Sequence, residues 1–377
     1  MKIPFNKPFL SGKELHFIED AIQTGHISGN GAFTKKCHQF FTDRYGFKKV
    51  LLTTSCTDAL EMCALLLNIK PGDEVIVPSY TFVSTALAFV RQGAKIVYVD
   101  SREDHPGLDE SKLEQLITPR TKAIVVVHYA GVACDMDKIM TIAKKYGIFV
   151  IEDAAQAIDS YYKGRPLGGI GHLGTFSFHE TKNIQSGEGG LLIINDNQFI
   201  ERAEILWEKG TNRAAFFRGM VDKYRWVDVG SSFLPSDLTA AYLFAQLLSL
   251  EKIQQSRLTI WENYFSLLKP LEQKGLFSLP FIPDYATNNG HMFYLVFSDP
   301  MVRTLCIHRL KEKGILSVFH YLSLHKSPFH ITTDKTIYEC LNADRYSESL
   351  LRLPLYVGLE DHFEELNQQL FSTMQDL

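Results

Sequence analysis

Residues 121–155, TKAIVVVHYAGVACDMDKIMTIAKKYGIFVIEDAA, contain two apolar runs joined by a segment with helical periodicity. The runs AIVVV and IFVI do not alternate with polar residues, which is typical of parallel strands buried on both faces of a sheet. The helix between them is expected to begin near Asp135. A strand, a crossover helix and a second strand are the repeating unit of an α/β fold.

The same alternation continues on both sides of this stretch. From residue 49 the chain reads KVLLTTS, a helical DALEMCALLLNI, EVIVPSY, a helix from Phe82, and AKIVYVD. After Ala155, the strand-like runs TFSFH and GGLLIIN flank ETKNIQSGE, which is too short for a crossover helix. We therefore predict an α/β protein with a mixed, mostly parallel sheet, in which ligands bind where the strands end.

The C-terminal third has a different pattern. A helical region from Asp237 to about Lys274 precedes the strand-like runs MFYLVF and ILSVFHYL and the terminal helices. A chain of 377 residues exceeds what one core usually organises. We predict a large α/β domain at 1–255 that binds the ligand, and a small α+β domain at 256–377. The longest irregular stretch, 209–236, is of a length that is usually functional in compact domains.

The composition argues against several classes of protein. A net charge of −4, from 39 basic and 43 acidic residues, gives no reason to expect nucleic acid as a partner. The six cysteines form no C-x-x-C pair and the 13 histidines show no compact ligand spacing, so neither a metal site nor a disulfide framework is predicted. The N-terminal MKIPFNKPFLSGKE lacks the apolar core of a signal peptide, and no run has membrane-spanning length. We expect a soluble, cytoplasmic protein without membrane contact.

The first candidate for a ligand contact is the segment 54–57, TSCT, between a strand and a helix. Free backbone N–H groups and hydroxyls at a helix start can bind a phosphate dianion. A Ser or Thr that only caps the helix is the alternative, and such caps are common.

The second candidate is Asp153, at the end of the buried run IFVIEDAA. An ionised carboxylate there needs a strong partner to offset its desolvation, and a protonated pyridine nitrogen would be one. Such a ring absorbs electrons from a carbanion. Gln156 could reach a neighbouring oxygen of the same ligand. The alternative is an Asp that caps the next helix.

The third candidate is Lys182, in the polar segment between two strands. An amine held near a phosphate and a ring can condense with an aldehyde. A single loop lysine is usually just solvated. Its context favours a function, because Ser177 precedes it on the strand and Gly187, Gly189 and Gly190 let the backbone approach a ligand closely.

A competing motif is the G-x-G-x-x-G pattern of residues 169–174, GIGHLG. Dinucleotide binding requires a strand before this motif and a helix after it. Here it follows the turn-like KGRPLG and precedes the strand TFSFH, so we reject a nicotinamide site.

The segments SCTDAL, PSYTFVST, VHYAGVACDMD, EDAAQ, GTFSFHETKN and GEGG together resemble the DegT/DnrJ/EryC1 family of sugar-nucleotide aminotransferases. The resemblance runs from about residue 3 to the C-terminus. It implies the aspartate aminotransferase fold, called fold type I, and a homodimer with active sites at the interface. It also implies pyridoxal 5′-phosphate as the cofactor, with Lys182 as the Schiff-base lysine and proton shuttle. The implied contacts are the pyridine nitrogen for Asp153, the phenolic oxygen for Gln156, ring stacking for Phe82, and the phosphate for Cys56, Thr57 and Ser177.

The resemblance further implies two substrates. L-glutamate would convert the cofactor to pyridoxamine phosphate, which would aminate a keto-deoxy sugar nucleotide such as dTDP-4-keto-6-deoxy-D-glucose. The expected donors to the pyrophosphate of the sugar nucleotide lie in the loop 209–236 and are Arg213, Arg218, Lys223 and Arg225. The expected contacts to the sugar are His320, Tyr321 and His325. A solvated loop surface is the alternative for the cations.

One position departs from the family pattern. Many members supply an Asn from the neighbouring subunit to the phosphate, but here SSFLPSDL places Leu234 at that position. Leucine cannot donate a hydrogen bond, so Ser231 or Ser232 would have to substitute.

Three rival functions remain to be compared. A sugar 3-dehydratase of the same fold has histidine where this chain has Lys182. A 3-keto sugar-nucleotide aminotransferase would use the same cofactor residues. A non-catalytic, ligand-sensing protein of this fold would not turn over glutamate with a keto sugar.

Overall fold

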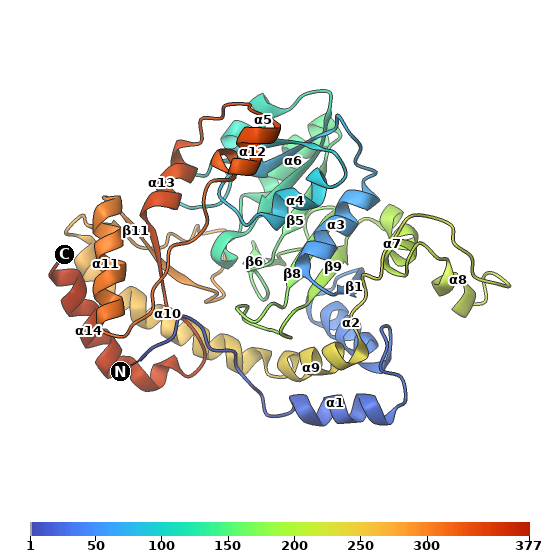
Figure 1. Ribbon diagram of the computed structural model, residues 1–377, viewed down its shortest axis with the longest axis horizontal. Coiled ribbons are helices and arrows are strands. Elements are labelled where there is room, and N and C mark those ends of the chain that lie inside the picture. Colours follow the sequence, from blue (N-terminus) through green and yellow to red (C-terminus); the bar gives the residue numbers. More distant parts are fainter. Residues whose placement is uncertain (1) are drawn as a thin grey trace.

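The computed structural model describes residues 2–377, and a seven-stranded sheet forms its centre (Figure 1). Across the sheet the strands are β1 (Lys49–Thr53), β9 (Gly190–Ile194), β8 (Leu173–Ser177), β5 (Phe149–Asp153), β4 (Thr121–Val127), β2 (Glu74–Pro78) and β3 (Lys95–Val99). From β8 to β3 all neighbours pair in parallel, whereas β9 is antiparallel to both β8 and β1. The predicted mixed, mostly parallel sheet is confirmed.

Helices cover both faces of this sheet, which explains the continuous apolar runs. In β4, Ile124 and Val126 belong to one core cluster, and Ala123 and Val125 belong to the other. The first cluster is closed by α2 (Ala32–Tyr45), α6 (Met136–Tyr146) and α9 (Asp237–Leu247), and the second by α3 (Cys56–Leu66), α4 (Ser84–Val90) and α7 (Ile200–Trp207). A strand between two helical layers has no solvent face and therefore needs no polar alternation.

A second, smaller sheet has its own core. It consists of the antiparallel strands β10 (Phe277–Ser278), β11 (Phe293–Phe297) and β12 (Leu350–Leu353), packed with α10 (Leu250–Glu272), α11 (Pro300–Glu312) and α14 (Phe363–Gln375). The long helix α10 connects the two parts, because Ile253 packs in the core of the large sheet and Ile260 in the core of the small one. The predicted boundary at residue 255 falls between these two residues. Ile3, by contrast, packs in the small core.

The structure differs from the predicted elements in two places. The run ILSVFHYL, residues 315–322, is not a strand, and makes only isolated bridges from Ile315 to Ile3 and from Val318 to Arg352. Its end cannot continue a ladder because Tyr321 has a left-handed backbone with φ 44°. The helical region 237–274 is two helices, α9 and α10, separated at Leu248 and Ser249.

The remaining helices and strands are mostly short. They are α1 (Glu14–Gln23), α5 (Leu113–Leu116), α8 (Arg213–Phe217), α12 (Pro328–Thr333), α13 (Leu341–Ser349), β6 (Tyr161–Tyr162) and β7 (Arg165–Pro166). The helix α1 packs on α9. The stretch 209–236 carries α8, which projects from the body of the molecule (Figure 1). Among residues 2–377, no helix combines the length and apolar character that crossing a bilayer requires.

Candidate active site

A cavity of about 420 Å³ lies at the carboxyl ends of the strands of the large sheet. It brings together all three candidate segments of the sequence. Its lining includes Cys56 and Thr57, Phe82, Asp153 and Gln156, Ser177, and Lys182. His320 and Tyr321 complete the wall from the C-terminal part of the chain.

The start of α3 forms one end of this cavity. Ser55 caps the helix, since its hydroxyl accepts a hydrogen bond from the N–H of Asp58. The cap therefore exists, but Cys56 and Thr57 also line the cavity. Gly190 of β9 packs against this turn so closely that a Cβ would lie 2.4 Å from the Ser55 carbonyl carbon. This helix end, with the Thr57 and Ser177 hydroxyls, is suited to a dianion.

Asp153 lies on the floor of the cavity, at the end of β5. One carboxylate oxygen accepts a hydrogen bond from the Thr85 hydroxyl at 2.7 Å, and the other accepts one from the N–H of Ala155 at 3.2 Å. Burial raises the pKa of Asp153 above its usual value. Within the described chain no basic side chain forms an ion pair with it. A cationic group of a ligand would therefore find a carboxylate that is held in place and has no cationic partner in the described chain.

The glycine-rich motif lies beside this strand and binds an anion of the protein itself. Ile170 and Gly171 of this motif, and Gly168 just before it, donate through their backbone N–H groups to the carboxylate of Glu152 at 2.6 to 2.8 Å. The imidazole of His128 lies 3.0 Å from the same carboxylate, and both side chains are fully buried. The rejection of a nicotinamide site at this motif agrees with its geometry, because its donors are already occupied.

Lys182 lies in the connection between β8, which ends at Ser177, and β9, which begins at Gly190. Its N–H bonds the carbonyl of His179, and the next residue, Asn183, is buried and donates to Gln254 and to the carbonyl of Asn289. Burial lowers the pKa of the Lys182 amine to about 8, against the opposing effect of Asp153. A lysine with this pKa keeps a substantial neutral fraction near neutral pH, as a nucleophile toward an aldehyde requires.

The aromatic wall of the cavity joins the two parts of the chain. The side-chain amide of Gln156 donates to the Tyr321 hydroxyl at 2.9 Å and accepts from the N–H of Ala130 at 2.6 Å. The Phe82 ring is 56% exposed and lies 6.1 Å from the Tyr321 ring, so one face is free to stack on a ligand. The Tyr129 hydroxyl lies 2.7 Å from Nδ1 of His320 and fixes that ring.

The other predicted substrate residues do not line this cavity in the same chain. Arg213 and Arg218 line a separate cavity of about 540 Å³ and pair with Glu208 and Glu204. Lys223 lines neither of these cavities.

Two further predicted residues lie outside the cavity for different reasons. The imidazole of His325 lies 2.6 Å from the Ser79 hydroxyl and faces Asp344, in a buried network. Ser232 is exposed, as is Ser231, and pairs with Glu208 in an isolated bridge.

Several residues of the cavity were missed by the sequence analysis, among them two hydroxyls, a histidine and an arginine. Thr85 holds Asp153, and Ser84 bonds Thr57 through their hydroxyls at 2.7 Å. Both follow Phe82 in PSYTFVST, where a run of hydroxyls at a helix start was the available signal. His291 and Arg352 lie in the C-terminal part, and no local pattern marks them.

These residues fit pyridoxal 5′-phosphate at three points. The α3 end suits the phosphate, Asp153 supplies the missing partner of a protonated ring nitrogen, and Lys182 suits the aldehyde carbon. The seven-stranded sheet with this cavity at its carboxyl edge is that of fold type I. Fold and site together define a pyridoxal-phosphate-dependent transferase.

Comparisons with known proteins identify the family. Residues 9–368 match the DegT/DnrJ/EryC1/StrS aminotransferase family, and the chain belongs to it. The spore coat polysaccharide biosynthesis protein SpsC of Bacillus subtilis (strain 168) is 32% identical over 367 residues, 95% of this chain and 93% of that protein. The putative sugar aminotransferase Spr1654 from Streptococcus pneumoniae in its PMP-form has a TM-score of 0.91 and 26% identity, with 100% of both chains covered. Its PLP-form has a TM-score of 0.90 and 25% identity, covering 100% of this chain and 99% of that one.

Proposed function

We propose that this enzyme transfers the amino group of L-glutamate to a keto-deoxy sugar nucleotide. The substrate we assign is dTDP-4-keto-6-deoxy-D-glucose, and the product dTDP-4-amino-4,6-dideoxy-D-galactose, a precursor of cell-surface polysaccharide. One observation carries the aminotransferase chemistry: Lys182, Asp153 and the α3 end line a single cavity. The sugar assignment is supported by the relatives, one described as acting in spore coat polysaccharide synthesis and one as a putative sugar aminotransferase.

Each cavity residue has a distinct task in this proposal. Bound pyridoxal phosphate supplies a cationic ring that accepts the electron pair left when a substrate carbon loses its proton. Asp153, held by Thr85 and the N–H of Ala155, keeps the ring nitrogen protonated. The Lys182 amine would remove a proton from the substrate carbon and would act as the acid that returns it on the cofactor side. Its pKa of about 8 suits a base that must also act as an acid.

We further propose that two copies of the chain pair with their active sites at the interface. The exposed Ser232, and the cations Arg213 and Arg218 on the projecting segment 209–236, lie away from the cavity of their own chain. A second copy would let them reach the phosphate and the sugar nucleotide of the partner.

The test combines trapping and turnover. Borohydride reduction of the holoenzyme, followed by peptide mass spectrometry, should place the cofactor on Lys182. The enzyme is then incubated with glutamate and a panel of dTDP-, UDP- and GDP-linked 3-keto and 4-keto sugars, and product stereochemistry is determined by NMR. An axial 4-amine on the dTDP sugar supports the proposal. A dTDP-4-keto-6-deoxy-D-glucose that stays inert overturns the substrate, and the absence of glutamate turnover with every sugar overturns the function.

A further inference from the structure

His291 lines the Lys182 cavity from the segment that leads into β11. Its side chain is buried, and both polar groups of its main chain are bonded. The N–H donates to the side-chain oxygen of Asn289 at 3.0 Å, and the carbonyl accepts from the guanidinium of Arg257 at 2.6 Å. The main chain therefore holds the imidazole at a fixed place in the cavity wall.

The hydrogen bonds of Asn183, the residue that follows Lys182, determine which nitrogen of this imidazole carries the proton. The side-chain nitrogen of Asn183 donates to the side-chain oxygen of Gln254 at 2.8 Å and to the main-chain carbonyl of Asn289 at 2.9 Å. A main-chain carbonyl can only accept, so the amide of Asn183 cannot be turned the other way round. Its oxygen lies 2.8 Å from Nδ1 of His291 and must accept from it. The neutral ring therefore carries its proton on Nδ1.

The second ring nitrogen of His291, Nε2, is left as an acceptor. In a neutral imidazole only one nitrogen is protonated, so Nε2 presents a lone pair. Burial and the charge of Lys182 hold the pKa of His291 well below its usual value, and Arg257, Arg352 and His320 act in the same direction. The ring therefore stays neutral. Among residues 2–377, the bond at Nδ1 is the only hydrogen bond that this ring makes.

The Lys182 amine is the donor nearest to this lone pair. Of the charges that act on the pKa of His291, that of Lys182 has the largest effect, as expected for the closest cation. The charges around the amine itself are those of Cys56 and Asp153, which raise its pKa, and of Arg352, which lowers it. In the described chain none of these groups forms a hydrogen bond with the amine, so it is free to turn toward Nε2.

We propose that His291 is a positioning residue for Lys182, whose amine donates a hydrogen bond to Nε2 of His291 whenever it is released from the cofactor. This inference rests on the proposed aminotransferase function, in which the released amine moves a proton. An amine that donates to a fixed acceptor is restricted in rotation, so it meets the substrate carbon in one orientation. His291 takes up no proton in this role, because its ring stays neutral.

Two substitutions separate the two nitrogens of the ring. In His291→Asn, the amide nitrogen can take the place of Nδ1 and bond Asn183, but nothing replaces Nε2. In His291→Gln, the longer amide reaches the place of Nε2 and can accept there, but the bond to Asn183 is lost. His308→Asn, which changes an exposed histidine on α11, is the control. Circular dichroism verifies that each variant folds.

The first measurement is the pKa of the Lys182 amine in the pyridoxamine-phosphate form, in which the lysine is free. Competitive acetylation across pH, read by peptide mass spectrometry, gives this pKa. An acceptor stabilises the ammonium more than the neutral amine, so His291→Asn should raise the acid dissociation constant of Lys182 ~10-fold. His291→Gln and His308→Asn should change it less than threefold. An unchanged constant in His291→Asn, or equal changes in the two His291 variants, would overturn the inference.

The second measurement identifies the tautomer. Nitrogen NMR of the holoenzyme with isotope-labelled histidine should show Nδ1 of His291 protonated and Nε2 unprotonated, with the signals assigned by their absence in His291→Asn. A proton on Nε2 at neutral pH would remove the acceptor and overturn the inference.

The third measurement is the single-turnover rate with L-glutamate, which should fall ~10-fold in His291→Asn and stay unchanged in His308→Asn. A wild type that reacts while His291→Asn matches its rate overturns the positioning role alone. A wild type that reacts with no amino acid overturns the proposed function, so the two failures are distinguishable.

Discussion

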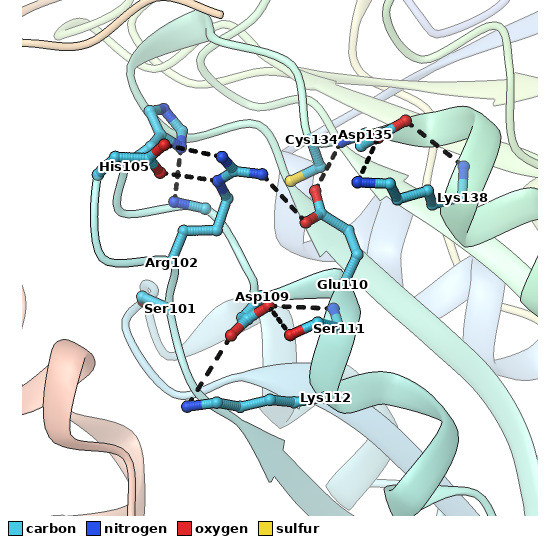
Figure 2. Close-up of polar contacts among 12 residues, drawn as sticks. Ser101, Arg102, His105, Asp109, Glu110, Ser111, Lys112, Cys134, Asp135 and Lys138 are labelled. Atoms are coloured by element: carbon cyan, nitrogen blue, oxygen red, sulfur yellow. Dashed lines mark hydrogen bonds and ion pairs between the residues drawn. The ribbon is translucent and has the colours of Figure 1, made fainter.

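The Arg102 cluster and the Lys182 cavity are two polar regions that differ in how their charged side chains are paired. In the cluster, defined here as Arg102, Asp104, Glu110, Asp135 and Lys138, the acidic and basic side chains form ion pairs, as Figure 2 shows for the labelled residues. The hydrogen bonds that Arg102 donates to Asp104 raise the pKa of Arg102. In the cavity, burial shifts Lys182, Asp153 and Arg352 toward their neutral forms.

The difference separates structural from functional charge. A charge that its own chain pairs contributes to stability and gains nothing from a ligand. A charge held in place without a partner reduces stability until a ligand brings the opposite charge. Mutations in the cavity should therefore change activity with little loss of stability, and mutations in the cluster should do the opposite.

The largest effect is expected for Lys182→Met. In the proposed mechanism, loss of the amine removes both the covalent anchor and the proton shuttle, so kcat with glutamate should fall at least ~10³-fold. Steady-state assays measure kcat, and circular dichroism verifies the fold. Retention of more than a tenth of the wild-type kcat would contradict the role of Lys182.

Asp153→Asn should have the next largest effect. An amide cannot keep the ring nitrogen protonated, so the glutamate half-reaction should slow ~10²–10³-fold. Stopped-flow absorbance measures this rate, with Asp137→Asn, an exposed aspartate outside the cavity, as the matched control. Rates within threefold of wild type would show that Asp153 only stabilises the turn at Ala155 and the Thr85 hydroxyl.

Arg102→Met tests the other side of the comparison. It leaves Glu110, whose side chain is 3% exposed, without its cation. The free energy of unfolding should fall by about 2–4 kcal/mol, whereas kcat should not change. Urea denaturation measures the first quantity. The exposed Arg165→Met should lose less than about 1 kcal/mol, and an equal loss for both variants would remove the distinction.

The smallest expected effect is that Lys182→Met stabilises the apoenzyme by an amount that depends on pH. The pKa of Lys182 is about 8 in the folded chain against a usual 10.5, so between these values the unfolded chain binds more protons and stability rises with pH. Lys182→Met removes this dependence of stability on pH, together with the cost of burying a protonated amine. The variant should be more stable than wild type by about 1–3 kcal/mol at pH 7, and its advantage should disappear between pH 8 and 10.5.

Urea denaturation of both apoproteins across this pH range gives the difference directly. An advantage of Lys182→Met that did not change with pH would attribute it to packing and not to the buried amine.

Much of the fold could be predicted because local pattern reports burial. The runs around Ile124 and Ile151 predicted buried strands, and their helices lie where the periodicity placed them. The run ILSVFHYL was misassigned, because its composition suits a strand but its partners, Ile3 and Arg352, lie far away in the chain and pair with it only at single residues. Local composition cannot report whether a partner strand exists.

In the cavity, too, some residues could be predicted from local sequence and others could not. Lys182, Asp153 and the α3 start could be predicted because each follows a strand, and parallel strands end at one edge of a sheet. The pairing of Arg218 with Glu204, and of His325 with Ser79, could not be predicted, because each partner comes from another segment, 14 and 246 residues away along the chain.

By itself, the sequence determined the order of strands and helices and the three groups that suit the cofactor, since both follow from patterns a few residues long. Only the tertiary structure decided which charges are paired. Arg102 and Arg352 are indistinguishable as residues, yet the chain brings carboxylates to one and aromatic rings to the other. Folding sets the surroundings of each charge, and those surroundings distinguish a cation that stabilises the protein from one available to a ligand.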